Sequence, residues 1–172
     1  MPDISQLQAR LQFFENQQAI RACINRYMTL CDSLDADTPL DELAGLFTCE
    51  AVWEGKGVRY ATSFGGYRGR EAIRAMFATY MRTPAHFALN AHFLASEVIE
   101  VEGDEGRGSW MMLQASTFAE GASHLNAARL TVCFALEEGH WRIAHFQTEN
   151  LFSRPTTAWN NDAPLPVPGQ AG

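Results

Sequence analysis

Residues 85–101 read AHFALNAHFLASEVIEV, and the spacing of apolar residues changes at the start of this stretch. Before it, apolar residues recur every three or four positions, which is typical of helices. From Ala85 onward they alternate with other residues, which predicts strands. We expect four long strands, over residues 86–101, 106–119, 124–137 and 140–152. Short glycine-containing segments between them predict tight connections, so the second half is expected to be an antiparallel meander.

The first half of the chain is predicted to be mainly helical. Apolar residues from Leu7 to Cys31 have helical spacing and predict a helix that ends near Asp32. A second helix is expected to start at once, with Thr38 as its N-cap and Pro39 in its first position.

A third helix is expected after Gly69, with its end at residues 82–84. Between the second and third helices, residues 51–54 predict a short strand, and another strand is expected around residues 60–64. Helices followed by a meander predict an α+β architecture. We expect a curved mixed or antiparallel sheet with three helices on its concave face and an apolar cavity between the layers.

Length and composition narrow the class of protein. The 172 residues are predicted to form one domain over residues 1–154, followed by a proline-rich tail over 155–172 that cannot continue a strand. A net charge of −7 and a single lysine, Lys56, argue against nucleic acid as a partner. No apolar run approaches the length of a membrane span, and no signal-peptide core is visible. We therefore expect a cytoplasmic protein with no membrane partner.

One histidine and one carboxylate stand out as candidates for catalysis. A histidine oriented by a carboxylate can remove a proton near neutral pH, and we expect His86 and Asp32 to form such a pair. Two readings of His86 stay open: it lines a pocket together with Asn90 and His92, or it faces solvent. In the first reading, Phe87, Leu89 and Phe93 on the other face of the strand would pack against a second subunit.

Asp32 has a plainer alternative, as a solvated turn residue or a helix cap. A carboxylate at the carboxyl end of a helix faces the negative end of the helix dipole, which is unfavourable by about half a kcal/mol. Asp35 and Asp37 lie nearer to the next helix and are better placed to cap it. A histidine partner would account for the position of Asp32.

Metal and nucleotide cofactors are not expected. The five histidines show no His-x-His or His-x-x-x-His pattern, and the four cysteines have no Cys-x-x-Cys spacing. Glycine-rich nucleotide loops and nucleophile-elbow motifs are also missing from the sequence. We predict no metal and no cofactor.

Several segments together resemble one family. They are the Tyr27–Asp35 segment, the run from Leu46 to Trp53, the helix start at 69–73, the segment 85–90 and the closing segment 139–143. In order and spacing they resemble the SnoaL-like branch of the NTF2-like superfamily over about residues 10 to 153. Within it, the chain is most similar to the scytalone dehydratase and hexachlorocyclohexane dehydrochlorinase group.

The resemblance implies a function. Enzymes of that group use an aspartate–histidine dyad without a cofactor, and the dyad positions match Asp32 and His86. The implied reaction is an elimination from a small cyclic, largely apolar substrate. A tail past the last strand closes the pocket in the dehydrochlorinase, which implies a lid role for the tail here, including Trp159. The dehydratase has a tyrosine immediately before the aspartate, where this chain has Cys31. The acid that assists the leaving group is therefore missing or different in this chain.

The sequence thus predicts a lyase with a small-molecule substrate. We expect four residues to bind that substrate: Tyr27, Trp53, Asn90 and Arg129. Tyr27 and Trp53 have the alternative of ordinary core residues. Two other functions stay open: a non-catalytic small subunit of an aromatic-ring hydroxylating dioxygenase, and a ligand-binding module without turnover. Phenylalanines on the outer strand face favour a homo-oligomer, a dimer or trimer.

Overall fold

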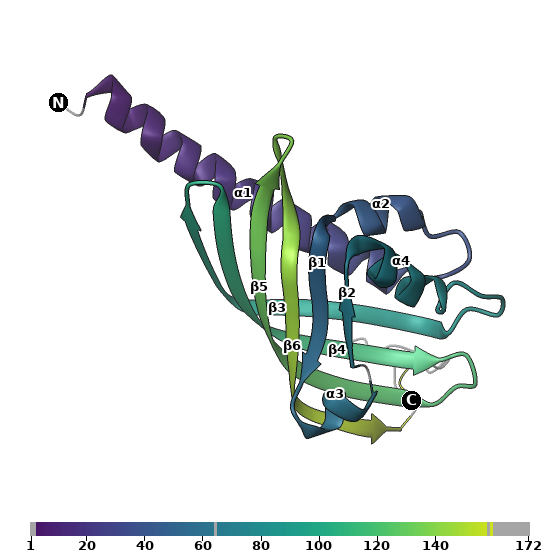
Figure 1. Cartoon of the computed structure of the whole chain (residues 1–172). Helices are drawn as coiled ribbons and strands as arrows, with labels where there is room; N and C mark the ends of the chain where they lie inside the picture. Colours follow the sequence, from purple (N-terminus) through teal and green to yellow (C-terminus); the bar gives the residue numbers. More distant parts are fainter. Residues whose placement is uncertain (1–2, 64, 158, 160–172) are drawn as a thin grey trace, which may run out of the picture.

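The computed structural model describes residues 3–63, 65–157 and 159 (Figure 1). In the first half of these residues the chain forms helices α1 (Ile4–Asp32), α2 (Leu40–Gly45), α3 (Val58–Ser63) and α4 (Arg70–Ala78), with strands β1 (Phe47–Lys56) and β2 (Gly66–Arg68) between them. In the second half it forms strands β3 (Phe87–Glu102), β4 (Glu105–Phe118), β5 (Ser123–Glu137) and β6 (His140–Thr156). The predicted helical first half and four-stranded second half are confirmed.

The strands form one six-stranded sheet in the order β2-β1-β6-β5-β4-β3. Neighbouring strands are antiparallel except β1 and β6, which run parallel, so the sheet is mixed. Figure 1 shows the sheet curving strongly, with α1 passing across one of its faces and α2 and α4 packed together at the end of β1. The predicted α+β architecture is confirmed, and its curvature creates the space for the site.

Helix α1 has two parts with different surroundings. From Ile20 onward, its buried face packs on the sheet, and the Gln17 side chain donates to the backbone oxygen of Ile99 on β3 at 2.9 Å. The preceding turns extend beyond the sheet (Figure 1), and Leu7 and Leu11 are exposed there. Hence the apolar pattern that predicts a single helix belongs to two surfaces.

The segment after β1 corrects one prediction. The strand expected over residues 60–64 is instead the short helix α3, and the partner strand of β1 is β2. Gly55 on β1 explains the difference, because a Cβ added there would lie 2.7 Å from the Tyr60 Cβ. The missing side chain leaves room for Tyr60 to pack closely over the strand, which places a helical turn across β1.

Two smaller predictions also need correction. Thr38 does not cap α2: its hydroxyl donates to the Ser33 carbonyl at 2.6 Å and accepts from the Asp35 amide at 2.9 Å, closing the loop between the helices. Proline does not end the last strand, because Pro155 lies inside β6 opposite His124. The pairing of β6 with β1 ends at Glu149, so the missing N–H of Pro155 lies on an edge that needs no donor.

A bulge in β3 determines which side chains face the concave side. Phe87 pairs with Phe118, whereas Leu89 pairs with Thr117, so β3 has one residue more than β4 at this point. An extra residue inverts the alternation of side chains along a strand. In a regular strand, residues separated by an even number of positions share a face. Across this bulge, they lie on opposite faces.

No helix within the described residues is long and apolar enough to cross a membrane. The predicted lid role of the tail falls mostly on residues 160–172, which lie outside the described residues. Trp159, which is described, has 39% of its surface exposed.

Candidate functional site

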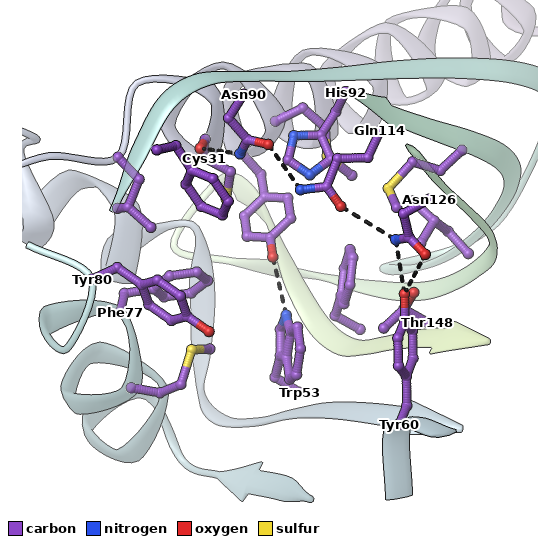
Figure 2. A pocket seen from close by; sticks show the side chains of 18 residues that line it. Cys31, Trp53, Tyr60, Phe77, Tyr80, Asn90, His92, Gln114, Asn126 and Thr148 are labelled. Atoms are coloured by element: carbon purple, nitrogen blue, oxygen red, sulfur yellow. Dashed lines mark hydrogen bonds between the residues drawn. The ribbon is translucent and has the colours of Figure 1, made fainter. Parts of the chain in front are cut away.

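A cavity of about 160 Å³ opens between α1, α4 and the concave face of the sheet (Figure 2). Its wall is mainly aromatic and aliphatic, with polar groups gathered on the side of β3, β4 and β5. The lining side chains are those of Tyr27, Met28, Cys31, Leu34, Trp53, Tyr60, Met76, Phe77, Tyr80, Phe87, Asn90, His92, Met112, Gln114, Asn126, Leu130, Phe146 and Thr148.

Asp32 and His92 form the hydrogen-bonded acid–histidine pair of this cavity. His92 Nδ1 lies 2.6 Å from Asp32 Oδ1, and the His92 backbone N–H donates to the same oxygen at 3.0 Å. Because a carboxylate only accepts, Nδ1 carries the proton of the neutral ring, and Nε2 holds the free lone pair. Among the described residues, Nε2 has no hydrogen-bond partner. With 10% of its side chain exposed, His92 lines the cavity through a ring that Asp32 holds in place.

His86 does not pair with Asp32, which corrects the predicted contact. Its Nδ1 lies 3.0 Å from the Arg82 guanidinium, its ring packs edge-on against Tyr80, Phe87 and Phe118, and it is not part of the cavity wall. The bulge near Phe87 is the physical cause. With regular alternation His86, Asn90 and His92 would share one face, but the extra residue keeps only Asn90 and His92 on the concave side.

The other predicted site residues divide in the same way. Tyr27, Trp53 and Asn90 line the cavity, and Trp53 Nε1 donates to the Tyr27 hydroxyl at 3.0 Å. Arg129 is exposed between the buried neighbours Ala128 and Leu130, so it lies on the opposite face of β5. Arg129 is therefore not a cavity residue, whereas Asn126 of the same strand is. Substrate binding by the three lining residues stays a prediction.

A row of polar side chains crosses the sheet beside the dyad and was only partly anticipated. Asn90 Oδ1 accepts from Gln114 Nε2 at 2.9 Å, and Gln114 Oε1 accepts from Asn126 Nδ2 at 3.3 Å. The Asn126 amide in turn bonds the Tyr60 hydroxyl at 2.9 Å, as Figure 2 shows. We call Asn90, Gln114, Asn126 and Tyr60 the polar row. Gln114 faces Asn126 directly in the β4–β5 register, a pairing that the strand lengths and turns could have revealed.

Burial raises the pKa values of three lining residues, Tyr27, Cys31 and Tyr80. Desolvation raises the pKa of the Cys31 thiol to about 12. Burial also raises the pKa of the Tyr80 hydroxyl, and that hydroxyl points toward Trp53 inside the cavity (Figure 2). Both groups are protonated at neutral pH, so Cys31 is a poor nucleophile and Tyr80 is a hydrogen-bond donor.

Over residues 3–63, 65–157 and 159, no group of three or more His, Cys, Asp or Glu side chains is arranged to hold a metal ion. That the protein uses no cofactor stays a prediction.

Comparison with known proteins defines first the fold and then the family. An NTF2-like protein with a cystatin-like fold from Novosphingobium aromaticivorans is 25% identical, with a TM-score of 0.67, covering 88% of this chain and 92% of that one. The model of the SnoaL-like domain matches residues 12–147. The chain belongs to the SnoaL-like family. No curated protein matches it.

Two further solved structures share the fold. The hexachlorocyclohexane dehydrochlorinase LinA-type3 from Novosphingobium barchaimii LL02 has a TM-score of 0.72 at 18% identity, with 90% of this chain and 99% of that one covered. A candidate scytalone dehydratase from Novosphingobium aromaticivorans DSM 12444 has a TM-score of 0.68 at 18% identity, with 92% and 97% covered. At this identity the likeness concerns the fold alone.

Proposed function

We propose that this protein is a cofactor-independent lyase that eliminates a leaving group from a small cyclic, largely apolar molecule. The observation that carries the proposal is the 2.6 Å contact between Asp32 and His92 at the wall of an otherwise apolar cavity. Support also comes from the family and from the fold shared with a dehydrochlorinase and a candidate dehydratase. His92 takes the role that the sequence pattern assigned to His86.

The proposed base is the Nε2 atom of His92. Its lone pair takes a proton from a substrate carbon, the C–H electrons form the new double bond, and the leaving group departs with its own electron pair. The ring becomes an imidazolium, which the Asp32 carboxylate stabilises through Nδ1. A halide leaves without further help, whereas a hydroxyl leaves as water and needs a proton.

Tyr80 is the proposed proton donor for a hydroxyl leaving group. Its hydroxyl points into the cavity from just after α4 (Figure 2), and it is protonated at neutral pH as a tyrosine hydroxyl ordinarily is. The dyad approaches from α1 and β3, so base and donor reach the cavity from different elements. Tyr80 would thus take the place of the tyrosine that the dehydratase has at the position of Cys31.

The cavity wall suggests the substrate class. Trp53 and Phe146 stack at 5.8 Å with an interplanar angle of 7°, which offers a flat apolar surface to a ring. The polar row beside His92 offers amide and hydroxyl groups to one or two oxygen substituents. We therefore propose a six-membered cyclic substrate with few polar groups, such as a β-hydroxyketone or a chlorinated cyclohexane.

The test measures two steps separately. Cyclic β-hydroxyketones and chlorinated cyclohexanes are incubated with the protein in D₂O, and deuterium exchange at carbon is followed beside loss of water or chloride. We expect His92→Ala to lower turnover by about 10²–10⁴-fold. It should also abolish exchange in the β-hydroxyketones, whose α-carbon can lose its proton as an enolate before the hydroxyl leaves. Tyr80→Phe should keep exchange but slow the loss of water.

His86→Ala is the matched control, since His86 lies outside the cavity, and it should retain turnover. Turnover that survives in His92→Ala but is lost in His86→Ala would reverse the assignment. Binding of these molecules without any exchange or elimination would identify a ligand-binding module instead. Copurification with a large Rieske-type subunit would indicate a dioxygenase small subunit.

A further inference from the structure

The first turns of α1 carry an apolar stripe that is largely exposed to solvent. Ile4, Leu7, Leu11 and Phe14 are exposed by 72%, 47%, 59% and 57%. Figure 1 shows this part of α1 extending past the end of the sheet. An isolated helix of this length is marginal in water, so an exposed stripe of this kind needs a partner.

The stripe is not a continuation of the face that packs on the sheet. At about 100° per residue, its four side chains point roughly half a turn away from Ile20, Ile24 and Tyr27. Contact with the body begins at Asn16 and Gln17, which accept from Trp141 at 3.3 Å and donate to Ile99 at 2.9 Å. Any partner of the stripe therefore comes from outside this chain's own core.

The spacing of the stripe is that of a two-heptad coiled coil. Positions 4, 7, 11 and 14 follow the three-four-three pattern of a and d positions. The seam ends where the next a and d positions become Gln18 and Arg21, and Arg21 is tied to Glu97 at 2.6 Å. The pattern thus stops where α1 joins the body.

The charges beside the stripe favour a second copy of the same helix in parallel orientation. Arg10 falls at a g position and Glu15 at the following e position. In a parallel pair of identical helices, g of one helix faces the next e of the other, so each Arg10 meets a Glu15 of the other copy. An antiparallel pair sets g against g and e against e, and this attraction is lost.

We propose that two copies of this protein associate through a parallel coiled coil of residues 4–15. The stripe faces away from the sheet, so the two bodies lie on opposite sides of the seam. The two-fold axis runs along it and closes the assembly. Each cavity remains within its own copy, because none of the stripe residues lines it.

The test is the mass of the full chain in solution, measured by light scattering across a concentration series. Leu7→Glu with Leu11→Glu places charges in the seam and should raise the dissociation constant at least tenfold. Gln6→Glu with Ala9→Glu adds the same charge at exposed positions away from the seam and should leave the mass unchanged. A wild type that is monomeric at every concentration, or a mass unaffected by the seam variant, overturns the proposal.

The direction of the helices has its own test. In a Cys49→Ser background, which removes the exposed native thiol, Leu7→Cys should cross-link to itself on mild oxidation. Arg10→Glu should weaken the dimer, and Arg10→Glu with Glu15→Arg should restore it. Cross-linking that occurs only between a Leu7→Cys and a Leu11→Cys chain would overturn the parallel arrangement. Far-UV circular dichroism checks that each variant stays folded.

Discussion

Asp32 lies at a point where a carboxylate is intrinsically unfavourable, the last residue of α1. The cost of facing the negative end of the helix dipole is about 0.3–1 kcal/mol. Two N–H groups of His92, one from the ring and one from the backbone, converge on a single Asp32 oxygen and offset it. The same two bonds orient the ring. The backbone N–H of His92 fixes the position of the carboxylate, and the carboxylate then fixes the position of Nδ1.

Substitution of Asp32 should lower the rate of the reaction more than the affinity for the substrate. Asp32→Asn keeps the size of the side chain, but its amide can donate to Nδ1 and favour the wrong tautomer of His92. We expect kcat to fall on the order of 10²-fold or more, with little change in substrate affinity. Steady-state kinetics and a ligand titration measure the two effects. Equal kcat values for Asp32→Asn and wild type would contradict the role of Asp32.

The cysteines should react in an order set by burial. Desolvation raises the pKa values of Cys23 and Cys31 to about 12, so roughly one molecule in 10⁴ has the thiolate at pH 8. Cys49 is exposed. We expect a maleimide to label Cys49 first at pH 8, as mapped by mass spectrometry of peptides. Labelling of Cys31 as fast as Cys49 would contradict the closed environment of the cavity wall.

Sequence periodicity predicts the long strands well and the candidate site less well. The four long strands follow from alternation and glycine turns, which are local features. The bulge near Phe87 depends on how β3 meets β4, and its alanine and leucine neighbours suit either face. Because of this one inserted residue, His86 faces away from the cavity, and His92 is the histidine that pairs with Asp32. Arg129 misses the cavity because it alternates along β5 with Leu130, which lines it.

The contact between α1 and β3 predicts a dependence of stability on pH. Hydrogen bonds from Arg21 lower the pKa of the Glu97 carboxyl below its usual value. Because the folded pKa is lowered, this contribution to stability is present above the unfolded pKa and is lost as the pH falls through the folded one. The pair is partly exposed, so we expect less than about 1 kcal/mol.

Urea unfolding at pH 7 and at pH 3 to 4 measures this contribution. Glu97→Gln should have a lower free energy of unfolding than wild type at pH 7 and about the same value at the acidic pH. The variant should therefore lose less stability than wild type as the pH falls. The control is Glu100→Gln, a change at an exposed position of the same strand. An unchanged slope in Glu97→Gln would show that the ion pair does not stabilise the fold.

A side chain at Gly108 on β4 should destabilise the fold by steric overlap alone. A Cβ at this position would overlap the six-membered ring of Trp110, and that ring cannot easily move because its Nε1 donates to Glu97 at 3.2 Å. We expect Gly108→Ala to lower the free energy of unfolding by about 1–3 kcal/mol in denaturant. Gly66→Ala is the control, since its nearest neighbour would be Glu54 Cβ at 3.7 Å. A smaller loss in Gly108→Ala than in Gly66→Ala would contradict the packing.

The cavity joins elements that are far apart in the sequence. Its wall draws on α1, α4, β1 and all four long strands, because the sheet curves around the space between them. A ligand inside therefore contacts most of the folded body at once, and none of those contacts survives unfolding. Binding should be linked to global stability and not only to the opening of one loop.

The linkage between ligand binding and folding can be measured as added stability. A cyclic, largely apolar ligand present at about 100 times its dissociation constant should add about 2.7 kcal/mol to the free energy of unfolding. The slope of the denaturant dependence should not change, since the same surface is exposed. Thr148→Met provides a control, because its flexible side chain would extend into the cavity from β6 without a new rigid contact. That variant should fold and lose the ligand effect, and an equal gain in both proteins would place the ligand outside the cavity.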